Sequence, residues 1–132
     1  MRWKRAHLAS WVGVCPGNHE SAGKRYSGKT RKGNRWLRRV LNQAAWAVSR
    51  THNTYLAARY RRLVARRGKK RAIVAIAHKL LLFAYTLLQR SCEYRDLGGD
   101  YFDRLGSDRL VRSLVHRIER LGHRVVLQPA GA

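Results

Sequence analysis

The 132-residue sequence is poor in acidic residues, in cysteine and in long apolar runs, and each shortage excludes a class of protein. Only 7 Asp and Glu stand against 29 Lys and Arg. The 2 cysteines, Cys15 and Cys92, and the lack of an apolar signal-length run after Met1 argue against a disulfide-stabilised secreted domain. The longest apolar run, residues 72–88, is interrupted by His78 and Lys79, so it predicts a buried core helix rather than a membrane span.

What the sequence has in excess is positive charge, and that charge is unevenly distributed. The formal net charge is +22. Residues 1–71 hold 20 basic residues and one acid, Glu20, whereas residues 72–132 hold 9 basic and 6 acidic residues. So many like charges repel one another, and binding to a polyanion relieves this repulsion and releases counterions. Because 45% of the residues are hydrophobic, the chain is not disordered. We therefore expect a nucleic-acid-binding first half on a nearly neutral packing half.

Hydrophobic periodicity predicts a mainly α fold, a small helical domain of four to five helices. The expected helices span residues 3–12, 34–50, 54–67, 72–89 and 107–121, with Asn34 and Ser107 as N-caps and Gly68 and Gly122 as helix ends. Residues 13–34 are expected to form a Gly-rich basic loop. At most one short C-terminal strand is expected, at residues 124–127. We expect residues 1–132 to form a single domain.

Two familiar site patterns in this sequence are weak. Residues 23–30 fit the phosphate-loop formula G-x-x-x-x-G-K-[ST], but no buried strand precedes them and Gly33 interrupts a following helix, so we expect a flexible basic loop that lies along phosphates. Cys15 and His19 have ligand-like spacing, yet no second close pair completes a zinc site. The carboxylates of residues 93–108 fit a solvated or salt-bridging surface better than a magnesium site. No metal site is predicted.

Cations and hydroxyls in the first half are the candidate functional groups. Ser21, Tyr26, Ser27 and Thr30 lie among cations that stabilise the charge of a phosphodiester under nucleophilic attack. By charge and position, eight residues are predicted to bind nucleic acid: Lys24, Arg25, Lys29, Arg31, Lys32, Arg35, Arg38 and Arg39. Spacing alone leaves open which hydroxyl, if any, acts as a nucleophile.

Several longer motifs carry a resemblance to a known family. They are the patterns P-x-x-x-x-S-x-G-K at residues 16–24, K-G-N-x-x-L-R at residues 32–38 and A-A-W at residues 44–46, with further similar segments at residues 55–60, 69–78 and 94–102. This combination resembles the C-terminal transposase domain of the insertion sequence 110/116/902 family, the serine-containing DEDD transposases. The resemblance extends over nearly the whole chain.

The resemblance implies a DNA recombinase that moves an insertion element. Members pair this domain with an N-terminal RuvC-like domain that holds magnesium on acidic residues, and some use a structured RNA to select DNA. The family's proposed nucleophile is a serine that forms a phosphoserine link to DNA, and by motif position it falls on Ser21. Magnesium is expected only in the RuvC-like domain, and no cofactor is expected on this chain.

The sequence begins at the front edge of the motif, so we expect a truncated or split copy that is inactive alone. DNA, an element-encoded RNA, a RuvC-like domain in trans and a second copy of the chain are its expected partners. The expected location is the bacterial cytoplasm, in association with the nucleoid. Two alternatives remain: a non-catalytic small basic RNA- or DNA-binding protein, and a less favoured cationic membrane-active protein, which would use the apolar stripes for lipid rather than for a core.

Overall fold

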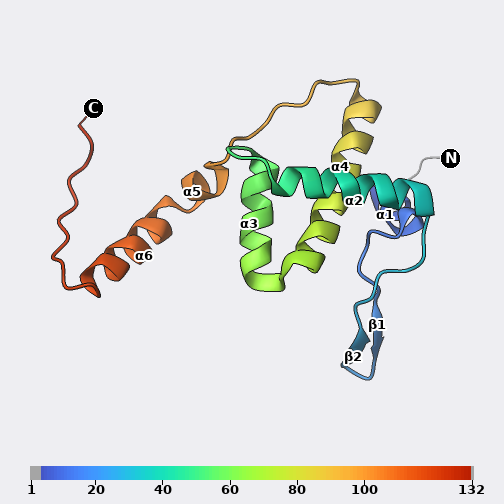
Figure 1. Cartoon of the computed structure of the whole chain (residues 1–132), viewed down its shortest axis with the longest axis horizontal. Coiled ribbons are helices and arrows are strands. Elements are labelled where there is room, and N and C mark those ends of the chain that lie inside the picture. Colours follow the sequence, from blue (N-terminus) through green and yellow to red (C-terminus); the bar gives the residue numbers. More distant parts are fainter. Residues whose placement is uncertain (1–3, 132) are drawn as a thin grey trace. The chain divides into compact units, whose positions relative to one another are not determined.

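A computed structural model describes residues 4–131 and confirms a mainly α fold. Within those residues it holds six helices and one two-stranded antiparallel sheet (Figure 1). The contacts divide the chain into two compact units, a larger one that ends at Gly99 and a smaller one that begins at Asp100. That a single domain spans the chain stays a prediction, and each unit is described by itself.

The larger unit consists of four helices and a hairpin. These elements are α1 (Arg5–Val12), β1 (His19–Ser21), β2 (Lys24–Ser27), α2 (Arg35–Ser49), α3 (Tyr55–Arg67) and α4 (Lys69–Arg90). Helices α2 and α3 begin where local signals predict, whereas α4 begins three residues earlier than expected. The side chain of Asn34 accepts a hydrogen bond from the Leu37 N–H at 2.9 Å, and Thr54 caps α3 in the same way. Gly68, with a φ of 80°, separates α3 from α4.

Helix α4 is the central element of the core, because it packs against α1, α2 and α3. It is the one helix of residues 4–131 that is long and apolar enough to cross a membrane by length and composition. Five of its apolar residues, Ala72, Ile73, Ile76, Ala77 and Leu81, are buried, whereas Leu88 near its end is 82% exposed, so only one side of the helix contributes to the core. The core consists of residues Ala9, Val12, Val14, Leu41, Ala45, Tyr60, Ala72, Ile73, Ile76, Ala77 and Leu81.

The segment that follows α4 is attached to the start of α3 by one carboxylate. Asp96 accepts hydrogen bonds from the Tyr55 N–H, at 3.2 and 3.3 Å, and from the Tyr94 hydroxyl at 2.9 Å. A negative charge at a helix N-terminus is favourable, because the first N–H groups of the helix have no partners inside it. Asp96 therefore holds residues 92–99 in place as a structural group.

Several details differ from the sequence-based expectation. Residues 19–27, expected as loop, form a hairpin, because Ala22 and Gly23 both adopt positive φ and close a two-residue turn. The polar stretch after residue 91 contains a short helix, α5 (Tyr101–Leu105). The strand expected at residues 124–127 is absent, and those residues have no regular structure. A single apolar segment has no partner strand to supply hydrogen bonds there.

The smaller unit contains α5 and α6 (Ser107–Glu119). Asp100 pairs with Arg104 at 3.0 Å, one helical turn later, which confirms a salt-bridging role for at least one carboxylate of this stretch. Ser107 is the first residue of α6 and not its N-cap, which is Gly106. The apolar residues of α6 recur at helical spacing, but no residue of the helix is buried.

Candidate functional site

Ser21 lies at the tip of the hairpin, directly before its turn. It is the last residue of β1 and the register partner of Lys24, the first residue of β2. Ala22 and Gly23 form the turn with φ values of 49° and 74°, the pair of positive angles that a type I′ hairpin turn requires. The hydroxyl of Ser21 is exposed and has no hydrogen-bond partner in the described part of the chain. The turn therefore presents this side chain to solvent rather than to the core.

The two strands of the hairpin bring further polar groups beside Ser21. Glu20 lies opposite Arg25, and His19 lies opposite Ser27 after a bulge. The rings of His19 and Tyr26 meet edge to face, with centroids 5.6 Å apart. All residues of both strands are exposed, so register, ring contact and turn geometry stabilise the hairpin without help from the core. Figure 1 shows it projecting away from α1–α4.

The base of the hairpin is a close crossing of two backbone segments. A Cβ on Gly33 would lie 2.2 Å from the carbonyl carbon and oxygen of Val12, and one on Gly13 would lie 2.7 Å from the Arg31 carbonyl oxygen. Only glycine permits backbones to approach this closely. Beside the crossing, the Asn34 N–H donates to the Trp11 carbonyl at 3.2 Å. Gly13 and Gly33 therefore permit the close backbone contact that fixes the base of the loop.

Residues 14–18 lead from α1 to the hairpin, and residues 28–33, the returning limb, lead from the hairpin to α2. Beyond the crossing, these two segments are joined a second time. The Gly17 N–H donates to the Lys29 carbonyl oxygen at 3.1 Å. Arg38 on α2 donates to Thr30 Oγ1 at 2.9 Å and to the Arg31 carbonyl oxygen at 3.3 Å. Together these bonds attach the returning limb to α2, so the hairpin extends from a fixed support.

The structure places the eight predicted nucleic-acid-binding residues along one continuous stretch of chain. Lys24 and Arg25 are on β2, and Lys29, Arg31 and Lys32 are on the returning limb. Arg35, Arg38 and Arg39 are in the first turns of α2. Seven of the eight are exposed, and Arg38 is half-buried because it bonds the loop. The sequence did not predict this structural role of Arg38.

The N-terminal end of α2 carries charges of the unfavourable sign. Its first turn has no acidic residue and holds arginines instead. The N-terminus of a helix has a partial positive charge, so cations there cost stability and an anion is attracted. The same arrangement recurs at the start of α4, where Lys69, Lys70 and Arg71 are exposed and follow Arg66 and Arg67 of α3. Both helix starts suit phosphate oxygens.

A cysteine and a histidine meet beside the base of the hairpin. Cys15 Sγ lies 3.7 Å from His78 Nδ1 on α4. Burial raises the pKa of the Cys15 thiol. Burial also lowers the pKa of His78, and the positive charge of Lys79 acts in the same direction. Burial thus opposes the charged form of each group, so the pair fits a neutral hydrogen bond better than a thiolate–imidazolium pair.

The phosphate-loop formula at residues 23–30 does not produce a phosphate loop. Its first glycine is in the hairpin turn, its next four residues are strand β2, and α2 begins only at Arg35. The cradle of N–H groups that leads directly into a helix is therefore missing from this segment. Within residues 4–131, no three His, Cys, Asp or Glu side chains lie close enough together to hold a metal ion.

Sequence reasoning missed two features of this unit. The hairpin was hidden because its strands have few of the β-branched residues that indicate a strand, and the pair Ala22–Gly23 was the one local signal. A cavity lined by aromatic rings and cations, on the side of α4 near Tyr55 and Tyr94, is assembled from distant segments. No spacing along the sequence could have indicated it.

Comparison with known protein families gives a match to the segment that carries the hairpin. Residues 3–61 match the family model described as Transposase IS116/IS110/IS902 family, and they include the hairpin, its base and all of α2. No curated protein and no solved structure matches the chain. The resemblance drawn from the motifs is confirmed over this segment, which is somewhat less than half of the chain. Residues 3–61 are therefore similar in sequence to the IS116/IS110/IS902 family of transposases, proteins of DNA transposition.

Proposed function

We propose that this chain is the DNA-binding, serine-bearing domain of an insertion-sequence recombinase, and that Ser21 is its nucleophile. One observation carries the proposal: Ser21 is exposed at the tip of a projecting hairpin whose base and returning limb are fixed and whose surroundings are basic. Two other hydroxyls of the loop, those of Ser27 and Thr30, already take part in hydrogen bonds and are less suited to attack. Ser27 accepts a hydrogen bond from the Lys29 N–H at 3.1 Å, and Thr30 accepts one from Arg38.

The proposed chemistry is a transesterification in which atoms balance without a redox partner. Ser21 Oγ forms a bond to phosphorus of the DNA backbone, and the bond from that phosphorus to one deoxyribose oxygen breaks. Ser21 loses its hydroxyl proton as it attacks, and the departing sugar oxygen gains a proton to become a hydroxyl. Lys24, the register partner of Ser21, is placed to stabilise the negative charge that develops on the phosphate.

The basic surface positions the strand for this attack. Cations on β2, the returning limb and the start of α2 lie on the segment that carries Ser21, so one phosphate backbone can follow them to the hairpin. Arginine grips phosphate bidentately and lysine acts as a point charge, and both types are present. The exposed cations at the turn between α3 and α4 offer a second phosphate-binding group.

The proposal assigns magnesium to another domain. The described residues do not provide three clustered ligands, and the family resemblance implies a RuvC-like domain with acidic metal ligands. We therefore propose that residues 4–131 bind DNA alone and form an adduct only beside such a domain, whether it belongs to the same polypeptide or to a partner. A structured RNA and a second copy of the chain are further proposed partners, and the proposed location is the bacterial cytoplasm with the nucleoid.

The adduct assay tests the nucleophile. The chain is mixed with a RuvC-like domain of the family, magnesium and end-labelled DNA, and covalent protein–DNA species are separated under denaturing conditions. We expect Ser21→Ala to abolish the adduct and Ser27→Ala, on the same hairpin, to retain it. If Ser21→Ala forms as much adduct as the parent, the nucleophile assignment is wrong.

The same variants separate catalysis from binding. Ser21→Ala removes one hydroxyl and no charge, so its affinity for DNA should equal that of the parent in a gel-shift titration. A chain that binds DNA tightly but never forms an adduct with any RuvC-like domain of the family would favour the non-catalytic binding protein.

A further inference from the structure

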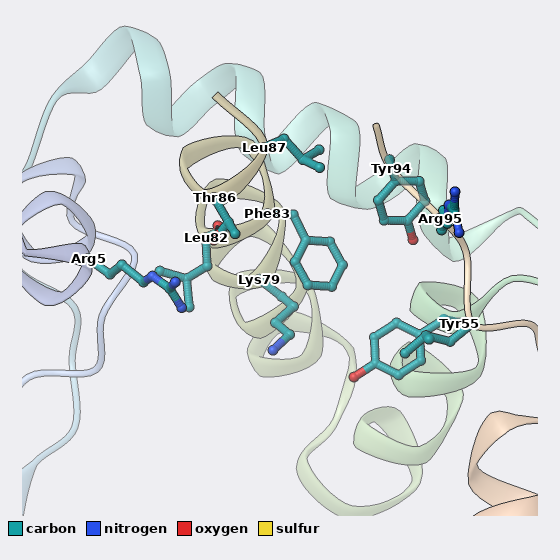
Figure 2. Close-up of a pocket in the computed structure, with 10 residues that line it drawn as sticks. Arg5, Tyr55, Lys79, Leu82, Phe83, Thr86, Leu87, Tyr94 and Arg95 are labelled. Atoms are coloured by element: carbon teal, nitrogen blue, oxygen red, sulfur yellow. Dashed lines mark hydrogen bonds between the residues drawn. The ribbon is translucent and has the colours of Figure 1, made fainter. Parts of the chain in front are cut away.

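A cavity of about 360 Å³ lies in the larger unit, away from the hairpin residues. Three aromatic rings line it: Tyr55 of α3, Phe83 of α4 and Tyr94 of the segment after α4. The Phe83 centroid lies 6.3 Å from that of Tyr55 and 5.7 Å from that of Tyr94. Figure 2 shows the three rings around the same space. Such a volume is at the lower end of the range for small-molecule pockets, roughly 300–1,000 Å³.

Three cations share the lining of this cavity. They are Arg5 of α1, Lys79 of α4 and Arg95, which follows Tyr94 (Figure 2). The Lys79 ammonium lies 5.3 Å from the centroid of the Phe83 ring, within the range of a cation–π contact. The cavity thus combines flat apolar surfaces with positive charge, and it has no acidic residue in its lining.

The aromatic wall is fixed in place by the Asp96 carboxylate, which is hydrogen-bonded to the first N–H group of α3. Asp96 accepts from the Tyr94 hydroxyl and from the Tyr55 N–H, so both aromatic residues have a common support. Burial and the bond to Asp96 raise the pKa of Tyr94 to about 12, which keeps its hydroxyl protonated as the donor. Tyr55 is buried, whereas about half of the Tyr94 side chain is exposed and presents ring surface to a ligand.

We propose that this cavity binds one unpaired nucleotide of a single-stranded nucleic acid, with the base against Phe83 and Tyr94 and the phosphate near Arg5, Lys79 and Arg95. Aromatic rings stack on bases of any sequence, and cations follow the backbone of a single strand. A base inside a duplex is already stacked and cannot enter a cavity of this size. This proposal rests on the proposed function only in taking nucleic acid as the partner, and no residue of the hairpin takes part in it.

The test compares single strands with a duplex. Binding of short labelled oligothymidine, of oligouridine and of a duplex of equal length is measured by fluorescence anisotropy for the parent, Phe83→Leu and Tyr85→Leu. Phe83→Leu keeps an apolar side chain in the cavity lining but removes the stacking surface. Tyr85 lies on the same helix outside the cavity lining and serves as the matched control. Circular dichroism verifies that each variant is folded.

We expect Phe83→Leu to weaken single-strand binding at least about fivefold and to leave duplex binding nearly unchanged. Tyr85→Leu should leave the binding of both nucleic acids nearly unchanged. A larger effect on oligothymidine than on oligouridine identifies DNA as the source of the nucleotide, and the reverse identifies RNA. Equal losses on single strands and duplex, or no loss on either, overturn the proposal.

A cross-linking experiment on the parent chain keeps the proposal testable even if Phe83→Leu unfolds. A single strand that carries a photoreactive 5-iodopyrimidine is irradiated with the protein, and the adduct is mapped by mass spectrometry. Cross-links at Phe83 or Tyr94 support the site, and cross-links confined to the hairpin overturn it. Ser21→Ala should leave these cross-links unchanged, so a failed nucleophile assignment and a failed cavity assignment give different results.

Discussion

Replacing Gly33 with alanine tests the close backbone crossing on which the hairpin depends. The added Cβ would lie 2.2 Å from the Val12 carbonyl group and 2.4 Å from the Gly13 nitrogen, where ordinary contact begins at 3.4 Å. Both neighbours are backbone atoms at the buried end of α1, so they cannot rotate away as a side chain would. The two segments must separate by about 1 Å, as in an overpacked core.

The expected cost follows from the contacts that this separation breaks. Overpacking costs roughly 1–3 kcal/mol, and loss of the hydrogen bond from Asn34 to Trp11 adds about 1 kcal/mol. We therefore expect Gly33→Ala to lower the free energy of unfolding by about 2–4 kcal/mol, a large share of the roughly 5–15 kcal/mol typical of a domain. Urea unfolding followed by tryptophan fluorescence measures it.

Gly131→Ala is the matched control, because no atom lies within 4 Å of a Cβ built there. It should unfold at the same urea concentration as the parent. If Gly33→Ala and Gly131→Ala unfold together, the two segments do not cross as closely as described, and the argument that glycines fix the base of the hairpin is refuted.

Three further predictions concern individual side chains. Arg38→Met loses its bonds to the returning limb, so it should lower the free energy of unfolding by about 1 kcal/mol and speed proteolysis at residues 28–33. The variant Arg39→Met, at an exposed neighbour, should change neither quantity. Equal cleavage of the two variants would contradict the structural role of Arg38. Burial raises the pKa of the Cys15 thiol, so iodoacetamide at mildly alkaline pH should alkylate exposed Cys92 faster, and equal rates would contradict the burial of Cys15. The pKa of Tyr94 is raised from 10.0 to about 12, so its contribution to stability is complete below pH 10 and is lost as the pH rises toward 12; Tyr94→Phe should not show this extra loss, and parallel pH curves would disprove it.

Local signals in the sequence were sufficient for most of the helical structure. Asn34 and Thr54 cap their helices through bonds to N–H groups three residues later, and Gly68 separates two helices, because these interactions involve near neighbours in the chain. Helical spacing puts Leu56 and Tyr60 of α3 on one apolar face, and both are buried. Spacing also puts Val40 on the apolar face of α2, yet Val40 is 59% exposed and Ala45 is buried instead, because the neighbouring helices decide which part of an apolar face is covered.

The hairpin shows that the position of a residue in a sequence motif does not reveal its conformation or its exposure. The motif placed Ser21 at the family's serine position, but it did not indicate a strand, a turn or exposure. Those depend on positive φ at Ala22 and Gly23 and on the pairing of two short strands. Ser107 illustrates the opposite error, since a good capping residue stands one position inside α6 and makes no cap.

The sequence by itself determined the excess of positive charge, most of the helices, the Asn34 cap and the motifs within residues 3–61, a segment similar to a transposase family. Each of these depends on composition or on residues a few positions apart. The tertiary structure alone decided how Gly13 and Gly33 cross, which arginine holds the loop, and which rings gather around one cavity. These features join residues far apart in the chain, and their distances are set by how α4 packs against its neighbours rather than by spacing along the sequence.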